Sequence, residues 1–239
     1  MEKRNLLYSG KAKDVYATDD PSLCIVYFRD SATAFNAQKK GEVADKGRLN
    51  NQISTHFFEL LGERGIETHF VRQIGPREML VRRLEIIKVE VVVRNITAGS
   101  LSKRLGLPEG LPINPPALEY YYKDDALGDP LVNDSHILAF GWASAAELRG
   151  IAETALRVND ILSPALRNLG LLLVDYKLEF GRCAGRVILG DEISPDTCRF
   201  WDAQTLEKLD KDRFRRDLGG VAEAYQEIYR RLKGGQVHV

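Results

Sequence analysis

The 239-residue sequence has no long apolar run. The longest runs, "GLLLV" and "VEVVV", are far shorter than the roughly 20 residues that a helix needs to cross a bilayer. The first residues, "MEKRNLLYSG", also lack the apolar region and the small-residue cleavage site of a signal peptide. We therefore expect a chain with no membrane span and no membrane partner.

The sequence also has no formal net charge and only three cysteines. The 34 basic and 34 acidic residues cancel, which argues against bulk attraction to nucleic acid or to a membrane surface. Cys24, Cys183 and Cys198 are odd in number and have no CxxC spacing, so we expect no disulfide framework. These features predict a cytoplasmic protein, in a reducing compartment, without a nucleic-acid partner.

Several common catalytic motifs are missing. The sequence has no GxSxG, HExxH or CxxC, and its histidines stand far apart, at His56, His69, His136 and His238. A histidine-based nucleophile relay or a zinc site therefore has little support.

What the sequence does contain is a strand-rich first part followed by long amphipathic helices. Strands are predicted over residues 5–10, 13–18, 23–30, 69–84 and 89–95. One helix is predicted from about Leu49 to Gly62 or Gly65, and a second from the Ser144–Glu147 capping box to Gly170. A third carries apolar residues over 221–232. The pattern predicts an α+β fold with a strand-rich N-terminal lobe and a mixed α/β C-terminal lobe.

A Pro- and Tyr-rich segment, residues 106–134, is predicted to be irregular. A loop that long inside a compact domain is usually functional rather than a linker. The boundary between the lobes is expected near residues 82 to 88.

The stretch "LVDYKLEFGRCAGRVILGDEISPD", residues 173–196, reads as a hairpin with one apolar and one charged face. Side chains alternate along a strand, so Asp175, Lys177 and Glu179 share a face. A turn near Cys183 is expected to place Asp175 opposite Asp191, and Glu179 opposite Val187. Because like charges across a strand pair are destabilising, a cation should lie between them. Magnesium could be this cation, since it is typically held by one or two carboxylates together with phosphate. The alternative is an edge hairpin whose charged face is simply solvated.

"LYSGKAKDVYAT" is a candidate phosphate loop. A turn at Gly10 would bring backbone N–H groups together with Lys11 and Lys13. The segment is similar to the glycine loop that covers ATP phosphates in kinase-like folds. An ordinary hairpin would give the same pattern.

Two further segments carry cations suited to anionic ligands. In "VVVRNITAGSLSKRLG", Arg94 ends a strand, and Gly99 and Ser100 lie near the start of a short helix. In "SPDTCRFWD", Arg199 alternates with apolar residues and could bind a carboxylate or phosphate through two hydrogen bonds. A plain strand-to-helix connection and a structural ion pair are the alternatives.

Taken together, six segments resemble the SAICAR synthetase family of purine-biosynthesis ligases. They are "SGKAKDVY", "VVRNITAGSLSKRLG", "KDDALGDPLVND", "LVDYKLEFG", "LGDEISPDTCRFWD" and "LDKDRFRRDLGG". The resemblance runs nearly end to end and is closest to the single-domain bacterial form. It implies a kinase- and ATP-grasp-related fold with an ATP-binding lobe over residues 1–83. The second lobe, residues 84–239, would hold the metal and imidazole-nucleotide site.

The resemblance also implies roles for individual residues. Glu179 and Asp191 correspond to the magnesium ligands beneath the ATP phosphates. The rest of the ATP site corresponds to the glycine loop, the inter-lobe hinge and one lysine: Gly10, Lys11, Ala12, Lys13, Val81, Arg82, Leu84 and Lys123. The imidazole nucleotide corresponds to Arg94, Ser100 and Arg199, with Asp175 and Lys177 near its reacting end. For aspartate, "DSATAFN" and "ADKGRLNNQ" give Ser31, Thr33, Lys46 and Asn50. The expected catalytic groups are Lys177, Asp175, Lys11 and Lys13.

The family reaction condenses an imidazole carboxylate with L-aspartate at the expense of ATP, through an acyl phosphate. The resemblance implies Mg²⁺ as cofactor, ATP, the carboxylated aminoimidazole ribonucleotide and L-aspartate as substrates, and a homodimer. A small-molecule kinase on the same lobes and a catalytically silent nucleotide-binding module are the rival hypotheses.

Overall fold

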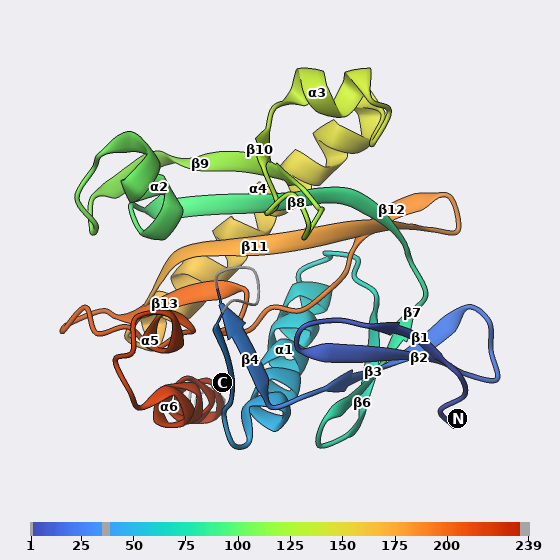
Figure 1. The fold of residues 1–239 in the computed structure, drawn as a ribbon, viewed down its shortest axis with the longest axis horizontal. Coiled ribbons are helices and arrows are strands. Elements are labelled where there is room, and N and C mark those ends of the chain that lie inside the picture. Colours follow the sequence, from blue (N-terminus) through green and yellow to red (C-terminus); the bar gives the residue numbers. More distant parts are fainter. Residues whose placement is uncertain (1, 35–38, 235–239) are drawn as a thin grey trace.

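The computed structural model describes residues 2–34 and 39–234, which form two large antiparallel sheets (Figure 1). The first sheet contains, in spatial order, β1 (Leu6–Ser9), β2 (Lys13–Ala17), β3 (Leu23–Phe28), β7 (Glu78–Arg82) and β6 (Phe70–Gly75). The second contains β10 (Leu131–Val132), β9 (Pro112–Tyr122), β8 (Glu85–Ile96), β11 (Leu171–Cys183) and β12 (Arg186–Leu189), and β13 (Cys198–Asp202) also pairs with β11. β4 (Ser31–Ala34) and β5 (Lys39–Glu42) form a separate ribbon.

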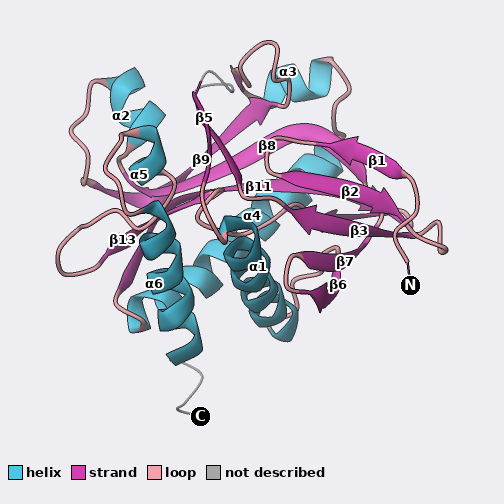
Figure 2. Ribbon diagram, turned by 60° about the horizontal axis from the view of Figure 1, so that its bottom comes forward, coloured by secondary structure: helices cyan, strands magenta, loops and turns pink. Residues whose placement is uncertain are grey.

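Helices cover both sheets. They are α1 (Lys46–Glu63), α2 (Gly99–Leu105), α3 (Asp134–Ala139), α4 (Ala145–Asn168), α5 (Asp212–Arg215) and α6 (Val221–Gly234). α1 packs against the first sheet and against α6, which lies beside it in Figure 2. None of the helices within the described residues is both long and apolar enough to span a membrane.

α1 and α4 are placed by their apolar faces. In α1, Leu49, Ile53 and Phe57 recur at helical spacing and are fully buried. α4 begins at the predicted capping box, in which Ser144 Oγ accepts the Glu147 N–H at 3.2 Å and Glu147 Oε2 accepts the Ser144 N–H at 2.8 Å. Its buried face packs on β8 and β11.

The α+β fold class is confirmed, as are the predicted β1–β2 hairpin and the three long helices. The hydrophobic core runs without interruption from β3 and α1 to β11 and α6. The lobe boundary at residues 83 and 84 stays a prediction.

The prediction of an irregular segment over residues 106–134 was wrong. Its central part forms β9, which pairs with β8 along most of its length. β10 covers the other edge of β9 only at Tyr120 and Tyr121. At Pro115 and Pro116, none of the described strands pairs with the outer edge of β9. Proline, which has no N–H to donate, is tolerated at such an open edge.

The predicted register of the charged hairpin was also wrong. The turn is Ala184–Gly185, both with positive φ, and Cys183 pairs with Arg186. This register brings Glu179 level with Gly190, whose N–H donates to the Glu179 carbonyl at 2.9 Å, rather than with Val187. Asp175 lies opposite Arg94 of β8 and Arg199 of β13 instead of opposite Asp191. The register differs because the turn lies at Ala184–Gly185, and Asp175 lies beyond the end of β12 at Leu189, where β13 is the neighbour of β11.

Candidate active site

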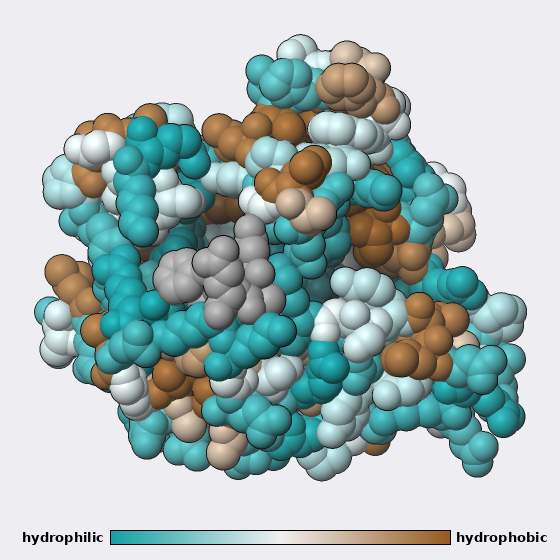
Figure 3. Space-filling model, viewed as in Figure 1, coloured by the Kyte–Doolittle hydropathy of each residue, from teal (hydrophilic) through white to brown (hydrophobic). Residues whose placement is uncertain are grey.

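Two cavities meet between the sheets. The larger, about 630 Å³, lies between the β1–β2 hairpin, the hinge after β7 and the charged face of β11. The smaller, about 280 Å³, lies between β8, β11, β13 and Thr33 of β4. The lining residues that they share are Lys11, Lys177, Asp196, Thr197 and Lys211. The face of the molecule in Figure 3 is largely hydrophilic, with apolar residues gathered toward α3 and β10.

One end of the larger cavity is apolar. Its walls come from neighbouring strands and from the hinge, and consist of Val15, Cys24, Val26, Val81, Leu84 and Ile86. The hinge itself is fixed by backbone bonds, since Arg82 N–H donates to the His69 carbonyl and Arg83 N–H to the Ser22 carbonyl, both at 2.7 Å. An apolar slot beside main-chain polar groups suits a heteroaromatic base.

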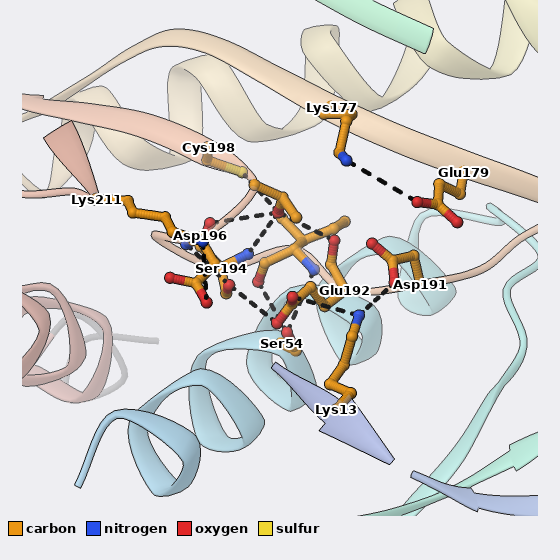
Figure 4. Close-up of polar contacts among 12 residues, drawn as sticks. Lys13, Ser54, Lys177, Glu179, Asp191, Glu192, Ser194, Asp196, Cys198 and Lys211 are labelled. Carbon is orange, nitrogen blue, oxygen red and sulfur yellow. Dashed lines mark hydrogen bonds and ion pairs between the residues drawn. The ribbon is translucent and has the colours of Figure 1, made fainter. Parts of the chain in front are cut away.

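The other end of the larger cavity holds buried carboxylates and lysines. Lys123 Nζ donates to Glu179 Oε1 at 2.6 Å. Lys13 Nζ pairs with Asp191 and lies 3.3 Å from Glu192 Oε1. Glu179, from β11, and Asp191 direct their carboxylates toward the same space (Figure 4). The carboxylates of the charged hairpin can therefore lie close together, because lysines from two other segments, Lys13 of β2 and Lys123 after β9, lie among them.

Electrostatics keep most of this cluster ionised. Burial opposes the charge of Asp191, but Lys13 and Lys177 outweigh it and lower the pKa of this carboxyl to about 2. Burial also opposes the Lys13 ammonium, yet Asp191 and Glu192 raise its pKa. Glu179 differs, since burial and the charge of Asp191 raise its pKa despite the nearby lysines. A further cation is therefore favourable beside Glu179.

Within the described residues, no three histidine, cysteine or carboxylate side chains converge tightly enough to hold a metal by protein groups alone. Glu179 and Asp191 supply two hard oxygen ligands of the kind that Mg²⁺ takes together with substrate phosphates. The donor set therefore fits magnesium that arrives with a nucleotide.

The glycine loop covers this charged end. Gly10, Lys11 and Ala12 line the larger cavity, and Gly10 N–H donates to the Lys13 carbonyl at 2.8 Å, which closes the turn. Lys11 Nζ lies 2.8 Å from Asp125 Oδ1, in the loop between β9 and β10.

The smaller cavity is built around Asp175. Its Oδ2 accepts from Arg94 and from Arg199, both at 2.7 Å. Arg94 also donates to Ser100 Oγ at 3.1 Å, and Asp175 links Arg94 to Arg199, so four of the predicted imidazole-nucleotide residues form one connected cluster. Cations outnumber carboxylates among the residues that line this cavity. The carboxylates are Asp175 and Asp196, and the cations are Lys11, Arg94, Lys177, Arg199, Lys211 and Arg215. Such an excess of cations suits a ligand with more than one negative group.

The four residues that are predicted to bind the substrate L-aspartate do not lie together. Thr33 lines the smaller cavity, and Ser31 Oγ donates to the Lys11 carbonyl at 2.8 Å. Lys46 is fully buried, with its Nζ 2.5 Å from Asp196 Oδ2. Asn50 is buried and lines neither cavity. Phe35 and Asn36, the end of the "DSATAFN" segment, lie outside the described residues.

The sequence did not point to several residues of the site: Glu90, His69, Glu192, Asp196, Lys211 and Arg215. Glu90 had a usable signal, since it is a carboxylate inside the apolar run "VEVVV" and is only 5% exposed. Its partner is Lys177, 2.8 Å away. His69 is also buried, and burial lowers the pKa of its imidazole to about 4, so the ring is neutral.

Comparison with known proteins gives a consistent result. The family described as SAICAR synthetase matches residues 6–232. Phosphoribosylaminoimidazole-succinocarboxamide synthase of Desulfitobacterium hafniense (strain DSM 10664 / DCB-2) is 60% identical over 233 residues, which cover 98% of both chains.

Solved structures agree. The synthase of the same name from Ehrlichia chaffeensis has a TM-score of 0.94 and 45% identity, covering 96% of this chain and 98% of that one. A SAICAR synthetase in complex with ADP has a TM-score of 0.92 and 51% identity, covering 95% and 97%.

Proposed function

This chain belongs to the SAICAR synthetase family, and from that premise we propose how its two cavities divide the family's reaction between them. The reaction is an ATP-dependent ligation of purine biosynthesis. It joins the carboxylate of a phosphoribosyl-aminoimidazole carboxylate to the amine of L-aspartate, and yields SAICAR, ADP and phosphate.

We place ATP in the larger cavity. The apolar slot with the hinge backbone suits adenine, and the glycine loop with Lys11 and Lys13 suits the phosphates. A relative of this family is described in complex with ADP, which supports a nucleotide in this fold. We assign Glu179 and Asp191 as the groups that hold Mg²⁺, which would neutralise charge on the phosphates when bound.

We place the imidazole nucleotide in the smaller cavity. Arg94, Arg199 and Ser100 are suited to its phosphate and polar groups. The observation that carries the proposal is that the two cavities meet, since Lys177 and Lys211 line both of them. With ATP in the larger cavity and the imidazole nucleotide in the smaller one, the ATP phosphates would lie next to the imidazole carboxylate.

The chemistry follows from this meeting point. A carboxylate oxygen of the imidazole nucleotide attacks the γ-phosphorus, and the bond to the bridging oxygen of ADP breaks. Lys177, Lys11 and Lys13 balance the charge on the phosphoryl group as it moves. The neutral aspartate amine then attacks the acyl carbon of the resulting acyl phosphate, the bond from this carbon to the phosphate oxygen breaks, and the amide forms as the amine proton passes to the departing phosphate. Asp175 acts by orienting Arg94 and Arg199.

We propose that L-aspartate binds at Ser31, Thr33, Lys46 and Asn50, and Thr33 has the best position because it lines a cavity.

We also propose a homodimer that works in the cytoplasm. The three cysteines are free thiols, which is in keeping with a reducing compartment. Light scattering after size exclusion measures the assembly.

The test is a single assay of the protein with ATP, magnesium, the imidazole nucleotide and L-aspartate. We expect ADP and the succinocarboxamide in equal amounts, and no sustained ADP release without aspartate. A stable phosphorylated nucleotide formed without aspartate would instead identify a small-molecule kinase.

A further inference from the structure

Asp212, the first residue of α5, is a buried carboxylate next to the smaller cavity. It is 1% exposed and lines neither cavity itself. Its Oδ2 accepts from Nε of Arg199 at 2.9 Å, and its Oδ1 accepts from Nη1 of Arg215 at 2.6 Å. Both arginines line the smaller cavity. One carboxylate outside the cavity therefore holds two of its cations.

Arg199 is held by carboxylates on two sides. While Nε donates to Asp212, Nη1 donates to Asp175 Oδ2 at 2.7 Å. Nη2 makes no hydrogen bond within the described part of the chain, and it lies so close to Gly99 that a Cβ there would collide with it. Because the guanidinium is planar and two of its nitrogens are held, its orientation is fixed, and Nη2 remains available to a ligand.

Asp210 fixes the position of Asp212 in turn. Asp210 is fully buried, and its Oδ1 accepts the Asp212 N–H at 2.7 Å. Its Oδ2 accepts the N–H of Phe200, the neighbour of Arg199 on β13, at 3.0 Å. Asp210 thus joins the backbone of α5 to the strand that carries Arg199. The distance between the Asp212 carboxylate and the Arg199 guanidinium is therefore set by the backbone on both sides.

The charge of Asp212 is maintained by the same two arginines. Burial opposes this charge, but Arg199 and Arg215 outweigh it and lower the pKa of the carboxyl. Removing one partner of a buried ion pair is strongly destabilising, so the contacts of Asp212 also contribute to stability. A test of any further role needs a readout that stability alone does not change.

We propose that Asp212 is a positioning residue for the imidazole nucleotide. It holds Arg199 and Arg215 in the orientation in which they reach this substrate, and it balances part of their charge when no substrate is bound. The inference rests on the proposed place of the imidazole nucleotide in the smaller cavity.

Asp212→Asn tests the proposal. The amide keeps the size of the side chain, but its oxygen replaces one carboxylate oxygen only, and its NH₂ group then faces an arginine as donor to donor. We expect the KM for the imidazole nucleotide to rise about 10-fold, the scale of one hydrogen bond to a charged group, and the KM for ATP to stay within about 2-fold. A lower melting temperature with both KM values unchanged, or an equal rise in both, would overturn the proposal.

Asp202→Asn is the matched control. Asp202 ends the same strand, β13, accepts from Arg231 at 2.7 Å and lines neither cavity. The change therefore breaks an arginine–carboxylate pair of the same kind away from the site. Both KM values should equal those of the unsubstituted protein, and a rise like that of Asp212→Asn would overturn the proposal.

A double-mutant cycle shows whether Asp212 acts through Arg199. Effects of residues that act together are not additive, so in an Arg199→Lys background Asp212→Asn should raise the KM for the imidazole nucleotide only about 3-fold. A further 10-fold rise, the same as in the unsubstituted protein, would overturn the proposal.

Asp212→Glu provides the test if the asparagine variant does not fold. It keeps the charge and moves the carboxylate by one methylene group, so the KM for the imidazole nucleotide alone should rise. A normal melting temperature with an unchanged KM would overturn the proposal. If Arg199→Lys itself leaves the affinity for the imidazole nucleotide unchanged, the place of this substrate in the proposed function fails, and this inference fails with it. If Arg199→Lys weakens binding and neither Asp212 variant does, only this inference fails.

Discussion

Lys177 of β11 and Glu90 of β8 form an ion pair across neighbouring strands, with 2.8 Å between Nζ and Oε1. Glu90 is also the strand partner of Glu179, so two buried carboxylates lie opposite each other. Lys177 lies 3.9 Å from Glu179 and Lys123 bonds to it at 2.6 Å, which offsets the repulsion between them. The same pair fixes the Lys177 ammonium at the junction of the two cavities.

Lys11→Met should leave stability almost unchanged and reduce turnover. The Lys11–Asp125 pair is exposed, so breaking it should change the free energy of unfolding by less than about 1 kcal/mol. Loss of a cation over the phosphates should lower kcat by about 100-fold, the scale of one transition-state stabilising group. Urea unfolding and steady-state assays measure the two effects.

Asp125→Asn is the control, because it breaks the same pair and keeps Lys11. Its kcat should stay within a few-fold of the unsubstituted enzyme. If both variants lost turnover equally, the pair itself, rather than the Lys11 charge, would be what matters.

Asp191→Asn should weaken the response to magnesium. A neutral amide is a poorer ligand for a hard cation, and the change keeps the size of the side chain. Lys13 retains Glu192 at 3.3 Å, which limits the loss of stability. We expect turnover to fall by about 100-fold or more, with partial recovery at high magnesium. Normal turnover at low magnesium would exclude Asp191 as a metal group.

Arg199→Lys should weaken binding of the imidazole nucleotide and leave ATP binding unchanged. Lysine keeps the charge but not the two-pronged geometry with which arginine binds carboxylate or phosphate. Affinity for the imidazole nucleotide should fall about 10-fold, the scale of one hydrogen bond to a charged group, while ATP affinity stays constant. Arg182→Lys is the control, because Arg182 lines neither cavity. An equal loss of ATP affinity would remove Arg199 from the second-substrate site.

The alternation along β11 was predictable from sequence because it is local. Tyr176, Leu178 and Phe180 are buried in the core, and Lys177 and Glu179 face the larger cavity. The capping box at Ser144 and the β1–β2 hairpin are local in the same sense.

Pairings between distant segments were not predictable. The β8–β11 register puts Glu90 beside Glu179, and Lys46 reaches Asp196 from 150 residues away. Neither contact leaves a periodic signal, because each depends on how separate elements pack. The predicted hairpin register was wrong because the turn lies at Ala184–Gly185, and no feature of "RVILGDEI" shows that β12 stops at Leu189, before Asp191.

Glu147 should make stability depend on pH. Hydrogen bonds from Arg182 and from the Ser144 N–H lower its pKa from 4.5 to about 2. Its folded pKa lies below its unfolded one, so the charged form stabilises the protein above about pH 4.5, and this contribution is lost as pH falls toward 2.

Glu147→Gln tests this dependence. At pH 7 the variant should be less stable by about 1 kcal/mol, because the pair with Arg182 is partly exposed. The difference should shrink between pH 4.5 and 3, as measured by urea unfolding. A difference that stays constant over that interval would show that the charge of Glu147 contributes nothing.

We propose that the two cavities bring the γ-phosphate of ATP to the imidazole carboxylate. The most direct measurement uses an imidazole nucleotide in which both carboxylate oxygens are ¹⁸O, with ATP, magnesium and unlabelled aspartate. Attack by the carboxylate on the γ-phosphorus, followed by amide formation, transfers one labelled oxygen to phosphate. We predict one ¹⁸O in each phosphate released, seen by mass spectrometry. Phosphate without label, formed at the same rate as the amide, would exclude attack of the imidazole carboxylate on the γ-phosphorus.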